Sequence, residues 1–260
     1  MSFSIEVSDL KINYTRESPD KPRQRVLLIH GTGCDSRVFE DLSHNLSDKY
    51  DVAAIDLPGH GRSEGDGFRG VADYAAYCVA LISSLGWDDC IVAGHSLGGG
   101  VAIAMSIYDA HLIKGLILID TGARLRVNPE VIEMARLEAK GKLKNKGTPR
   151  VGFSNKTPLE IIERVQNITR QANPVVTFKD WIADDTCDFM SRMSKIEHPT
   201  LAICGREDQL TPLKYHQYLM EEMPNCVLEI IEDAGHWSFV ERPREFFGAL
   251  SQFLDNLSGS

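Results

Sequence analysis

This 260-residue chain lacks the segments that mark a membrane or secreted protein. No apolar run approaches the length of a membrane span, and residues 1–7 contain neither the basic n-region nor the apolar h-region of a signal peptide. Basic residues are also in deficit, with 28 lysines and arginines against 37 aspartates and glutamates and a net charge of −9. Proteins that bind DNA or RNA normally carry a basic excess. We therefore expect a soluble, cytoplasmic protein that neither inserts into a membrane nor binds nucleic acid.

Cysteine pairs and metal-binding motifs are absent as well. The six cysteines show no C-x-x-C spacing, which argues against both structural zinc and a disulfide framework. The eight histidines are dispersed, and no H-E-x-x-H motif occurs. We expect no metal and no cofactor. Most of the cysteines are expected to be buried thiols that pack as small apolar residues; they are Cys34, Cys78, Cys90, Cys187, Cys204 and Cys226.

The chain does have an ordinary globular composition, 43% hydrophobic and 25% charged, and its length suits one large α/β domain with an insertion. Residues 3–7 and 10–14 alternate apolar and polar side chains, which predicts a hairpin at a sheet edge. Residues 26–29 are apolar throughout, as in a strand buried on both faces. Strand and helix patterns then alternate, which predicts a mostly parallel sheet flanked by helices. The other expected strands are 52–56, 91–93, 115–120, 200–204 and 227–231, and the expected helices are 36–46, 71–85, 101–105, 212–223 and 242–257.

The alternation is interrupted between residues 122 and 195. This segment shows helical patterns at residues 130–140, 158–172 and 177–193, and it contains no convincing strand. We therefore predict that residues 1–121 and 196–260 form the α/β core. Residues 122–195 would then form a helical cap, or lid, inserted before the last two strands.

One turn organises the rest of the chain. The strand at residues 91–93 leads into Gly94-His95-Ser96-Leu97-Gly98, and a helical pattern follows at once. Gly-x-Ser-x-Gly between a strand and a helix is typical of a nucleophile elbow, a turn so tight that the serine backbone is strained. Glycines at 94 and 98 would let the neighbouring chains pass closely, and the Ser96 hydroxyl would stand beside free N–H groups of the helix. The alternative is a glycine-rich turn with a capping serine.

A serine nucleophile needs a base to take its proton, and histidine is the side chain whose pKa suits that role. The histidine in turn needs a carboxylate to orient it. Asp208 follows one expected strand, and His236 follows the last one. Because parallel strands all end at the same edge of a sheet, we expect both side chains beside Ser96. The chain therefore contains a candidate nucleophile, acid and base.

Five short motifs occur at specific spacings: His30-Gly31, Asp56-x-Pro58-Gly59-His60-Gly61-x-Ser63, Gly94-x-Ser96-x-Gly98, Gly205-x-x-Asp208 and Gly235-His236. In this order they resemble the α/β-hydrolase family, and within it the capped single-domain serine esterases and carboxylesterases. The resemblance covers residues 26–120 and 200–257 and leaves only the cap unmatched. It implies a catalytic triad with Ser96 as nucleophile, His236 as base and Asp208 as orienting acid.

The resemblance also implies an oxyanion hole formed by two backbone N–H groups. One belongs to Leu97, which follows the nucleophile, and the other to Thr32, which follows the His-Gly motif. Gly33 is the other candidate for the second donor. Asp120 also ends an expected strand and remains an alternative acid, whereas Glu207 lies next to Asp208 but has no match in the family.

The other histidines are interpreted as scaffold. His216 lies in a helical pattern and is expected on the helix surface, while His95 is expected to pack beside the elbow. His30 and His60 belong to structural loops of the motifs. Haloalkane dehalogenases and epoxide hydrolases are excluded because both use an aspartate where this chain has Ser96.

The expected cap differs from the core in charge. Residues 122–195 contain 14 basic and 9 acidic residues, a net of +5, whereas the remainder of the chain carries −14. We interpret the dense basic run at 136–146, with Arg150 beyond it, as a solvated helix end. The alternative is that Arg124, Arg126 and this run face the pocket mouth. They would then attract an anionic ester, an acyl-CoA or an acyl group on an acidic carrier protein.

The sequence thus predicts a cofactor-free serine hydrolase that cleaves a carboxylic ester or thioester of a small molecule through an acyl-enzyme on Ser96. Two alternatives share the same triad. One is a carbon–carbon bond hydrolase, and the other is a small-molecule receptor of the hydrolase fold with slow turnover. Rapid multiple turnover would favour an enzyme, whereas a single slow turnover with a ligand-induced shift in melting temperature would favour a receptor.

Overall fold

Eight strands form one sheet in the computed structural model, which describes residues 1–258. They are β1 (Ser2–Val7), β2 (Leu10–Glu17), β3 (Arg25–Ile29), β4 (Asp51–Ile55), β5 (Cys90–His95), β6 (Ile113–Ile119), β7 (Thr200–Gly205) and β8 (Cys226–Ile231). Their order across the sheet is β1-β2-β4-β3-β5-β6-β7-β8. The hairpin β1–β2 is antiparallel and lies at one edge, and β4, β3 and β5 to β8 are mutually parallel. The predicted α/β fold with an edge hairpin is confirmed.

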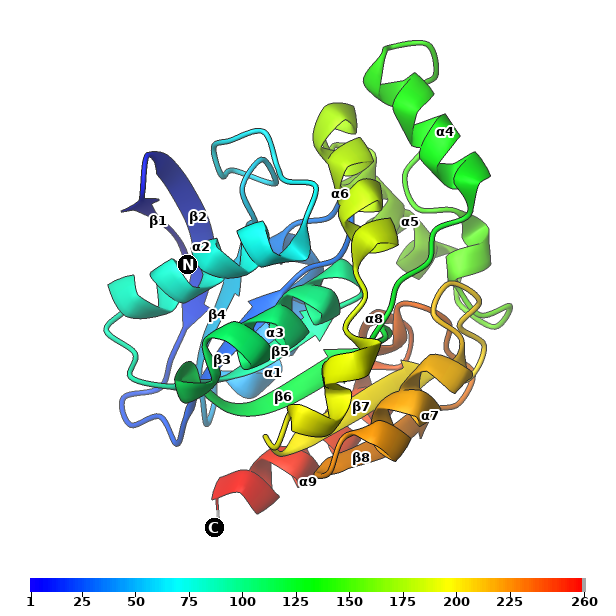
Figure 1. Cartoon of the computed structure of the whole chain (residues 1–260). Coiled ribbons are helices and arrows are strands. Elements are labelled where there is room, and N and C mark those ends of the chain that lie inside the picture. The colour runs from blue at the N-terminus through cyan, green and yellow to red at the C-terminus, as the bar shows by residue number, and fades with distance from the viewer. Residues whose placement is uncertain (259–260) are drawn as a thin grey trace.

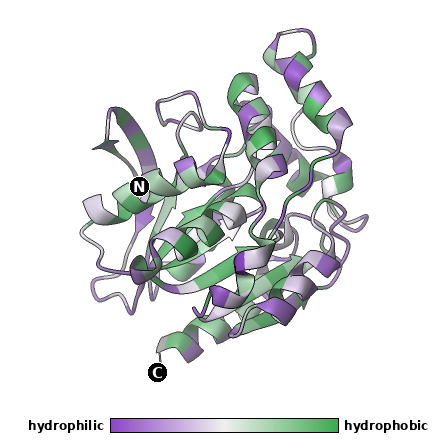
Figure 2. Cartoon of the chain, viewed as in Figure 1, coloured by the Kyte–Doolittle hydropathy of each residue, from purple (hydrophilic) through white to green (hydrophobic). Residues whose placement is uncertain are grey.

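The central strands are buried on both faces, as their continuous apolar sequences predict. Along β3, Val26 and Leu28 join one core cluster and Leu27 and Ile29 join the other, because successive side chains of a strand point to opposite faces. All four are fully buried. A side chain of this size contributes about 1.5–3 kcal/mol when it is removed from water. Figure 2 shows the same pattern as hydrophobic residues along the central strands.

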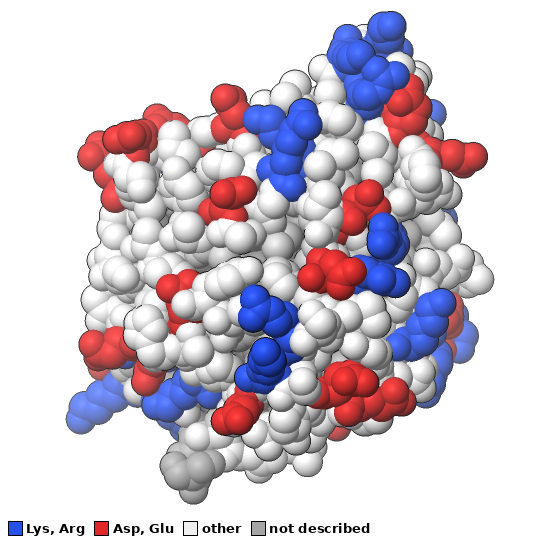
Figure 3. Space-filling view, in the orientation of Figure 1, with Lys and Arg blue, Asp and Glu red and all other residues white. Residues whose placement is uncertain are grey.

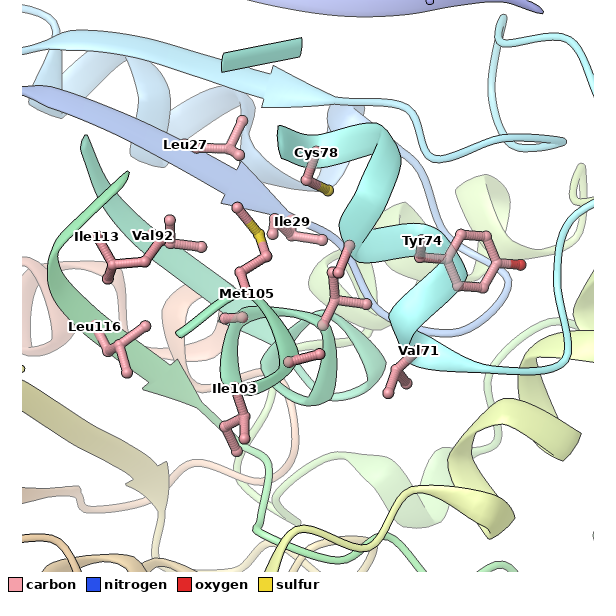
Figure 4. Close-up of a cluster of buried hydrophobic side chains, with 14 of the residues drawn as sticks. Leu27, Ile29, Val71, Tyr74, Cys78, Val92, Ile103, Met105, Ile113 and Leu116 are labelled. Carbon is pink, nitrogen blue, oxygen red and sulfur yellow. The ribbon is translucent and has the colours of Figure 1, made fainter. Parts of the chain in front are cut away.

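Helices cover both faces of the sheet (Figure 1). The helices α2 (Val71–Ser84), α3 (Leu97–Tyr108) and α7 (Leu213–Glu222) pack on the face of Leu27 and Ile29, and α1 (Glu40–Leu46) and α9 (Pro243–Ser258) pack on the other. Figure 4 shows side chains of α2 and α3 meeting those of β3, β5 and β6 in the first cluster. A short helix that the sequence did not predict, α8 (Ser238–Glu241), follows β8.

A helical insert separates β6 from β7. It contains α4 (Pro129–Ala139), α5 (Leu159–Thr169) and α6 (Pro174–Thr186), with 3₁₀ turns at Arg150–Gly152 and Met190–Lys195. In Figure 1 these helices stand together beyond one side of the sheet, and α4 packs against α6. The predicted position of a helical insert before the last two strands is confirmed.

One predicted helix of the insert is wrong in extent. The pattern at residues 177–193 predicted a single helix, but α6 ends at Thr186. The next residues pair with the start of the insert instead: Phe189 N–H donates to the Ala123 carbonyl (2.8 Å), and Leu125 N–H donates to the Cys187 carbonyl (3.2 Å). These contacts join segments about 60 residues apart, so helical periodicity alone could not reveal them.

Two further findings concern membrane-spanning helices and the cysteines. Among residues 1–258, no helix is long and apolar enough to cross a membrane. The six cysteines are free thiols; five are buried as predicted, and Cys226 is half-buried.

Candidate active site

Ser96 lies at the turn between β5 and α3, where the tight geometry predicted for an elbow is confirmed. Its backbone has φ 53° and ψ −118°, in the region that non-glycine residues rarely adopt. A Cβ atom on Gly94 would overlap the carbonyl of Gly98, and one on Gly98 would overlap the carbonyl of Ile29. Only glycine at these two positions lets α3 begin directly against β3 and β5.

Ser96, His236 and Asp208 form a continuous hydrogen-bonded chain. The Ser96 Oγ lies 3.0 Å from His236 Nε2, and His236 Nδ1 lies 2.9 Å from Asp208 Oδ2. A carboxylate can only accept, so Nδ1–H donates to Asp208 and the neutral ring keeps Nε2 free to accept from the serine hydroxyl. His236 and Asp208 are buried, and Ser96 is partly exposed. The reactive oxygen is thus accessible while its partners are shielded.

Asp208 is held by its own loop. Its Oδ1 accepts from the N–H groups of Leu210 (2.8 Å) and Thr211 (3.0 Å), and its Oδ2 accepts from the Thr211 hydroxyl (2.7 Å). Burial alone would raise the pKa of Asp208, but His236 and these donors lower it to about 2. The pKa of His236 is set by the same two opposing effects, burial and the charge of its partner. Burial lowers the pKa of the imidazole, but the Asp208 carboxylate outweighs burial and raises that pKa above its usual value.

Asp120 occupies a different place from Asp208. Its Oδ1 accepts from Gly205 N–H (2.9 Å), and its Oδ2 accepts from the N–H (3.0 Å) and hydroxyl (2.7 Å) of Ser238. Burial, with the nearby Asp208 charge, raises the pKa of Asp120 to about 7. Asp120 therefore ties together the two loops that carry Asp208 and His236 rather than touching the imidazole.

The loop after β3 lies against Ser96. A Cβ atom on Gly31 would lie 2.9 Å from His95 Nδ1 and 3.0 Å from the Ser96 Cβ, closer than side chains normally approach. The Gly33 N–H is already used, because it donates to Asp180 Oδ2 (3.0 Å). The Thr32 N–H has no acceptor among residues 1–258. Leu97 begins α3, where first-turn N–H groups have no acceptor within the helix. Of the two predicted alternatives for the second donor, Thr32 has the free amide.

The prediction that His216 lies on a helix surface is wrong. His216 is fully buried on the face of α7 that also carries Leu219, and its Nε2 accepts from Thr121 N–H (2.9 Å). The Thr121 hydroxyl in turn donates to the Ser96 carbonyl (2.7 Å). His216 therefore holds Thr121 in place, and Thr121 in turn holds the backbone of Ser96.

The other three histidines that the sequence analysis interprets as scaffold, His30, His60 and His95, are buried beside the site. His95 packs against the indole of Trp237, with ring centroids 4.6 Å apart. His30 Nε2 accepts from Leu57 N–H (3.1 Å). His60 Nε2 donates to Asp180 Oδ2 (2.7 Å), across the boundary between core and insert.

Three buried carboxylates near the site were not singled out from the sequence: Asp180 and Asp184 on α6, and Glu241 on α8. Glu241 accepts from the N–H groups of Gly235 (2.8 Å) and Ser154 (2.8 Å), so it joins the His236 loop to the insert. A signal for the α6 pair was available. Both acids fall on the helical stripe that also buries Val176, Ala183 and Cys187, and a charge on a core-facing stripe is unusual.

The arrangement can perform nucleophilic acyl chemistry with side chains and amides alone. Among the described residues 1–258, no group of three or more histidine, cysteine, aspartate or glutamate side chains could hold a metal ion.

Comparison with protein families gives one match that spans most of the chain. The model described as the alpha/beta hydrolase family matches residues 26–249. Among curated proteins, the chain is 27% identical over 256 residues to a pimeloyl-[acyl-carrier protein] methyl ester esterase of Neisseria meningitidis serogroup A. That match covers 93% of this chain and 80% of the relative.

Solved structures give the same picture. The chain is 31% identical to a thermophilic esterase, with a TM-score of 0.83 and coverage of 99% of this chain and 98% of that one. A thermophilic esterase from Thermogutta terrifontis, solved with malate bound, has a TM-score of 0.87 at 22% identity, with 99% of each chain covered. At that identity the second likeness concerns the fold alone.

Proposed function

Since the chain belongs to the alpha/beta hydrolase family, we propose that it is a serine esterase that cleaves a carboxylic ester or thioester through an acyl-enzyme on Ser96. The observation that carries the proposal is the hydrogen-bonded chain from Ser96 Oγ through His236 to Asp208, at 3.0 and 2.9 Å. The esterases among its relatives support it.

The proposed reaction has two halves. In the first, Ser96 Oγ attacks the substrate carbonyl while His236 Nε2 takes its proton, and the Leu97 and Thr32 N–H groups stabilise the oxyanion. His236 then gives that proton to the leaving alkoxide or thiolate as the carbon–oxygen or carbon–sulfur bond breaks. In the second half, water loses a proton to His236, attacks the acyl-enzyme and releases the carboxylic acid together with free Ser96.

Asp208 contributes by keeping the imidazole oriented and by stabilising its protonated form. Its lowered pKa keeps it ionised throughout the cycle. Residues 122–195 act in this proposal as a cap over the core formed by residues 1–121 and 196–260. Contacts such as the bond from His236 N–H to the Gly152 carbonyl (2.8 Å) hold the insert against the catalytic loop.

A second candidate is a substrate whose acyl group is anionic or carrier-bound. Lys140, Lys142, Lys144 and Lys146 lie beyond the end of α4, are exposed and form no ion pair within residues 1–258. Figure 3 shows basic side chains gathered over this end of the insert. A relative named for an ester on acyl-carrier protein supports this candidate. The lysine positions also suit the solvated helix end inferred from the sequence, and the salt dependence of hydrolysis distinguishes the two.

The proposal is tested by steady-state hydrolysis of chromogenic esters that differ in acyl length, on the wild type and on Ser96→Ala. We expect multiple turnover with a preferred acyl length in the wild type and a loss of about 10⁴-fold or more in the variant. A wild type no faster than the variant on every ester would refute simple ester hydrolysis. A single slow turnover with a ligand-induced rise in melting temperature would favour the receptor alternative.

A further inference from the structure

Two acidic residues one helical turn apart on α6 contact consecutive residues of the loop after β3. Asp180 Oδ2 accepts from the Gly33 N–H (3.0 Å), and Asp184 Oδ2 accepts from the Thr32 hydroxyl (2.5 Å). Both acids are almost completely buried. The insert is thus joined directly to the loop that supplies the proposed second oxyanion donor.

Asp180 has every partner that a buried carboxylate needs. Besides Gly33, it accepts from His60 Nε2 (2.7 Å) and from the Tyr74 hydroxyl (2.6 Å). Figure 4 shows Tyr74 reaching from α2 with its hydroxyl directed away from the apolar cluster. Burial opposes ionisation of Asp180, but His60 and these hydrogen bonds lower its pKa, so it forms a buried ion pair with His60.

Asp184 is different, because only one of its oxygens is bonded. Its Oδ1 is buried and has no hydrogen-bond partner among residues 1–258. A buried carboxylate with one bare oxygen is costly when it is ionised, whereas the neutral acid needs no counter-charge. Burial accordingly raises the pKa of Asp184 to about 7.

The surroundings of Asp184 contain no base placed to neutralise it as His60 neutralises Asp180. The titratable groups within electrostatic range are Asp180 and Asp185 on α6, Cys187 just after it, Tyr74 on α2 and His236 after β8. Burial has the largest effect on Asp184 and disfavours its ionisation, as do the Asp180 and Asp185 charges, whereas the hydrogen bond from Thr32 and the His236 charge favour it. A bound ester would exclude water from Ser96 and its neighbours and would disfavour the charge further.

We propose that Asp184 is a positioning residue of the oxyanion hole, which in its uncharged form holds Thr32 by the hydroxyl and so aims the Thr32 N–H at the reacting carbonyl. The inference rests on the proposed function. The N–H of the next residue, Gly33, donates to Asp180 and is therefore not available as the second oxyanion donor. An uncharged Asp184 also avoids placing a second negative charge beside the oxyanion that develops in the transition state.

The test uses a fluorophosphonate, which phosphonylates an activated serine with loss of fluoride and places its P–O bond in the oxyanion hole. The second-order labelling rate of Ser96 is measured at pH 6 and pH 8 for the wild type, Asp184→Ala, Asp184→Asn and Asp185→Asn. Asp185 is the matched control, because it lies on the same helix but accepts from Val127 N–H (3.2 Å) inside the insert. Melting temperatures are recorded for every variant.

We expect Asp184→Ala to be labelled about 10-fold more slowly or worse, since removal of a whole oxyanion donor costs about 10²–10³-fold. Asp184→Asn, a neutral acceptor, should recover most of this loss. Its rate relative to the wild type should increase from pH 6 to pH 8, as the wild-type carboxyl ionises. Asp185→Asn should stay close to the wild type at both pH values, because it removes only a small contribution to the pKa of Asp184 and no contact with Thr32.

A double-mutant cycle with Thr32→Val tests whether Asp184 acts on the labelling rate through the Thr32 hydroxyl. The valine removes the hydroxyl and keeps the amide, so it should reproduce the loss in Asp184→Ala, and the double variant should be no worse than either single one. Additive losses, or normal labelling of Thr32→Val, would overturn the inference. If Asp184→Ala does not fold, Thr32→Val and Asp184→Asn decide. A wild type that is not labelled at all would instead refute the proposed function.

Discussion

His95 donates its Nε2–H to the backbone carbonyl of His236 over 2.8 Å. A carbonyl can only accept, so the proton of the neutral His95 ring must lie on Nε2. Burial lowers the pKa of His95 to about 3, which keeps the ring uncharged at all ordinary pH values. Because His95 immediately precedes Ser96, this bond fixes the base relative to the nucleophile.

The role of His95 predicts a difference between two substitutions. His95→Leu leaves a buried carbonyl without its donor, a loss of about 1–3 kcal/mol of stability. It should also lower kcat about 10-fold while KM changes little, because the His236 loop shifts. His95→Gln offers an amide donor and should retain more activity. Ester kinetics and thermal melts measure both, and equal kcat values for the two variants would contradict the positioning role.

Asp208 and Asp120 are expected to respond differently to amidation. Asp208→Asn removes the charge that orients His236, so kcat should fall about 10⁴-fold. Asp120→Asn replaces one acceptor oxygen by an NH₂ group facing Gly205 or Ser238, so the main effect should be on stability, about 1–3 kcal/mol. If Asp120→Asn loses as much activity as Asp208→Asn, the assignment of the triad acid is wrong.

The fold and the juxtaposition of Ser96, Asp208 and His236 could be predicted because they depend on local patterns and on one topological rule. Ser96 stands in a five-residue motif, and Asp208 and His236 each follow an apolar strand. Parallel strands end at the same edge, so their order in the chain was enough to bring these residues together. The edge of the sheet at which the site lies therefore follows from the direction of the parallel strands.

The supporting carboxylates could not be predicted in this way, since each acts between distant segments. Asp184 lies 152 positions from Thr32, and Glu241 lies 87 positions from Ser154. His216 was misplaced for a related reason. Helical periodicity assigns a polar residue to the solvent side unless a buried partner such as Thr121 is known.

Glu241 provides a stability prediction. Its four acceptor contacts bind the N–H groups of Gly235, Trp237 and Ser154 and the Thr157 hydroxyl. Glu241→Gln keeps one oxygen and turns an NH₂ group toward two of these donors, so it should lose about 1–3 kcal/mol of stability and part of kcat. Glu245→Gln, at an exposed position in the first turn of α9, is the control and should melt like the wild type. Similar melting of both variants would refute the conclusion that Glu241 joins the His236 loop to the insert.

The basic end of the insert predicts a salt effect. If Lys142, Lys144 and Lys146 attract an anionic substrate, kcat/KM for an acyl-CoA should fall steeply between about 50 and 200 mM salt, because screening shortens the range of the attraction. A neutral ester of the same acyl length should be insensitive. Replacement of all three lysines by glutamine should remove the difference. Equal salt responses of the two substrates would leave these lysines as a solvated helix end.

The pH dependence follows from the sign of the His236 shift. Catalysis needs the neutral imidazole, so kcat/KM should rise with pH through the pKa of His236 and reach its plateau above the usual histidine value of about 6.5. That pKa is raised because the Asp208 carboxylate outweighs burial. Removing the carboxylate should take away the largest effect that opposes burial, leaving only the Asp120 and Asp184 charges, and should therefore lower the pKa of His236. Ser96→Ala provides a direct measurement, since it leaves the imidazole and its acid in place while preventing turnover. NMR titration of its His236 ring should give a midpoint above about 6.5, and the Ser96→Ala, Asp208→Asn double variant should give a lower one. The same midpoint in both proteins would mean that Asp208 does not set the proton affinity of the base, and the assignment of the acid would then fail.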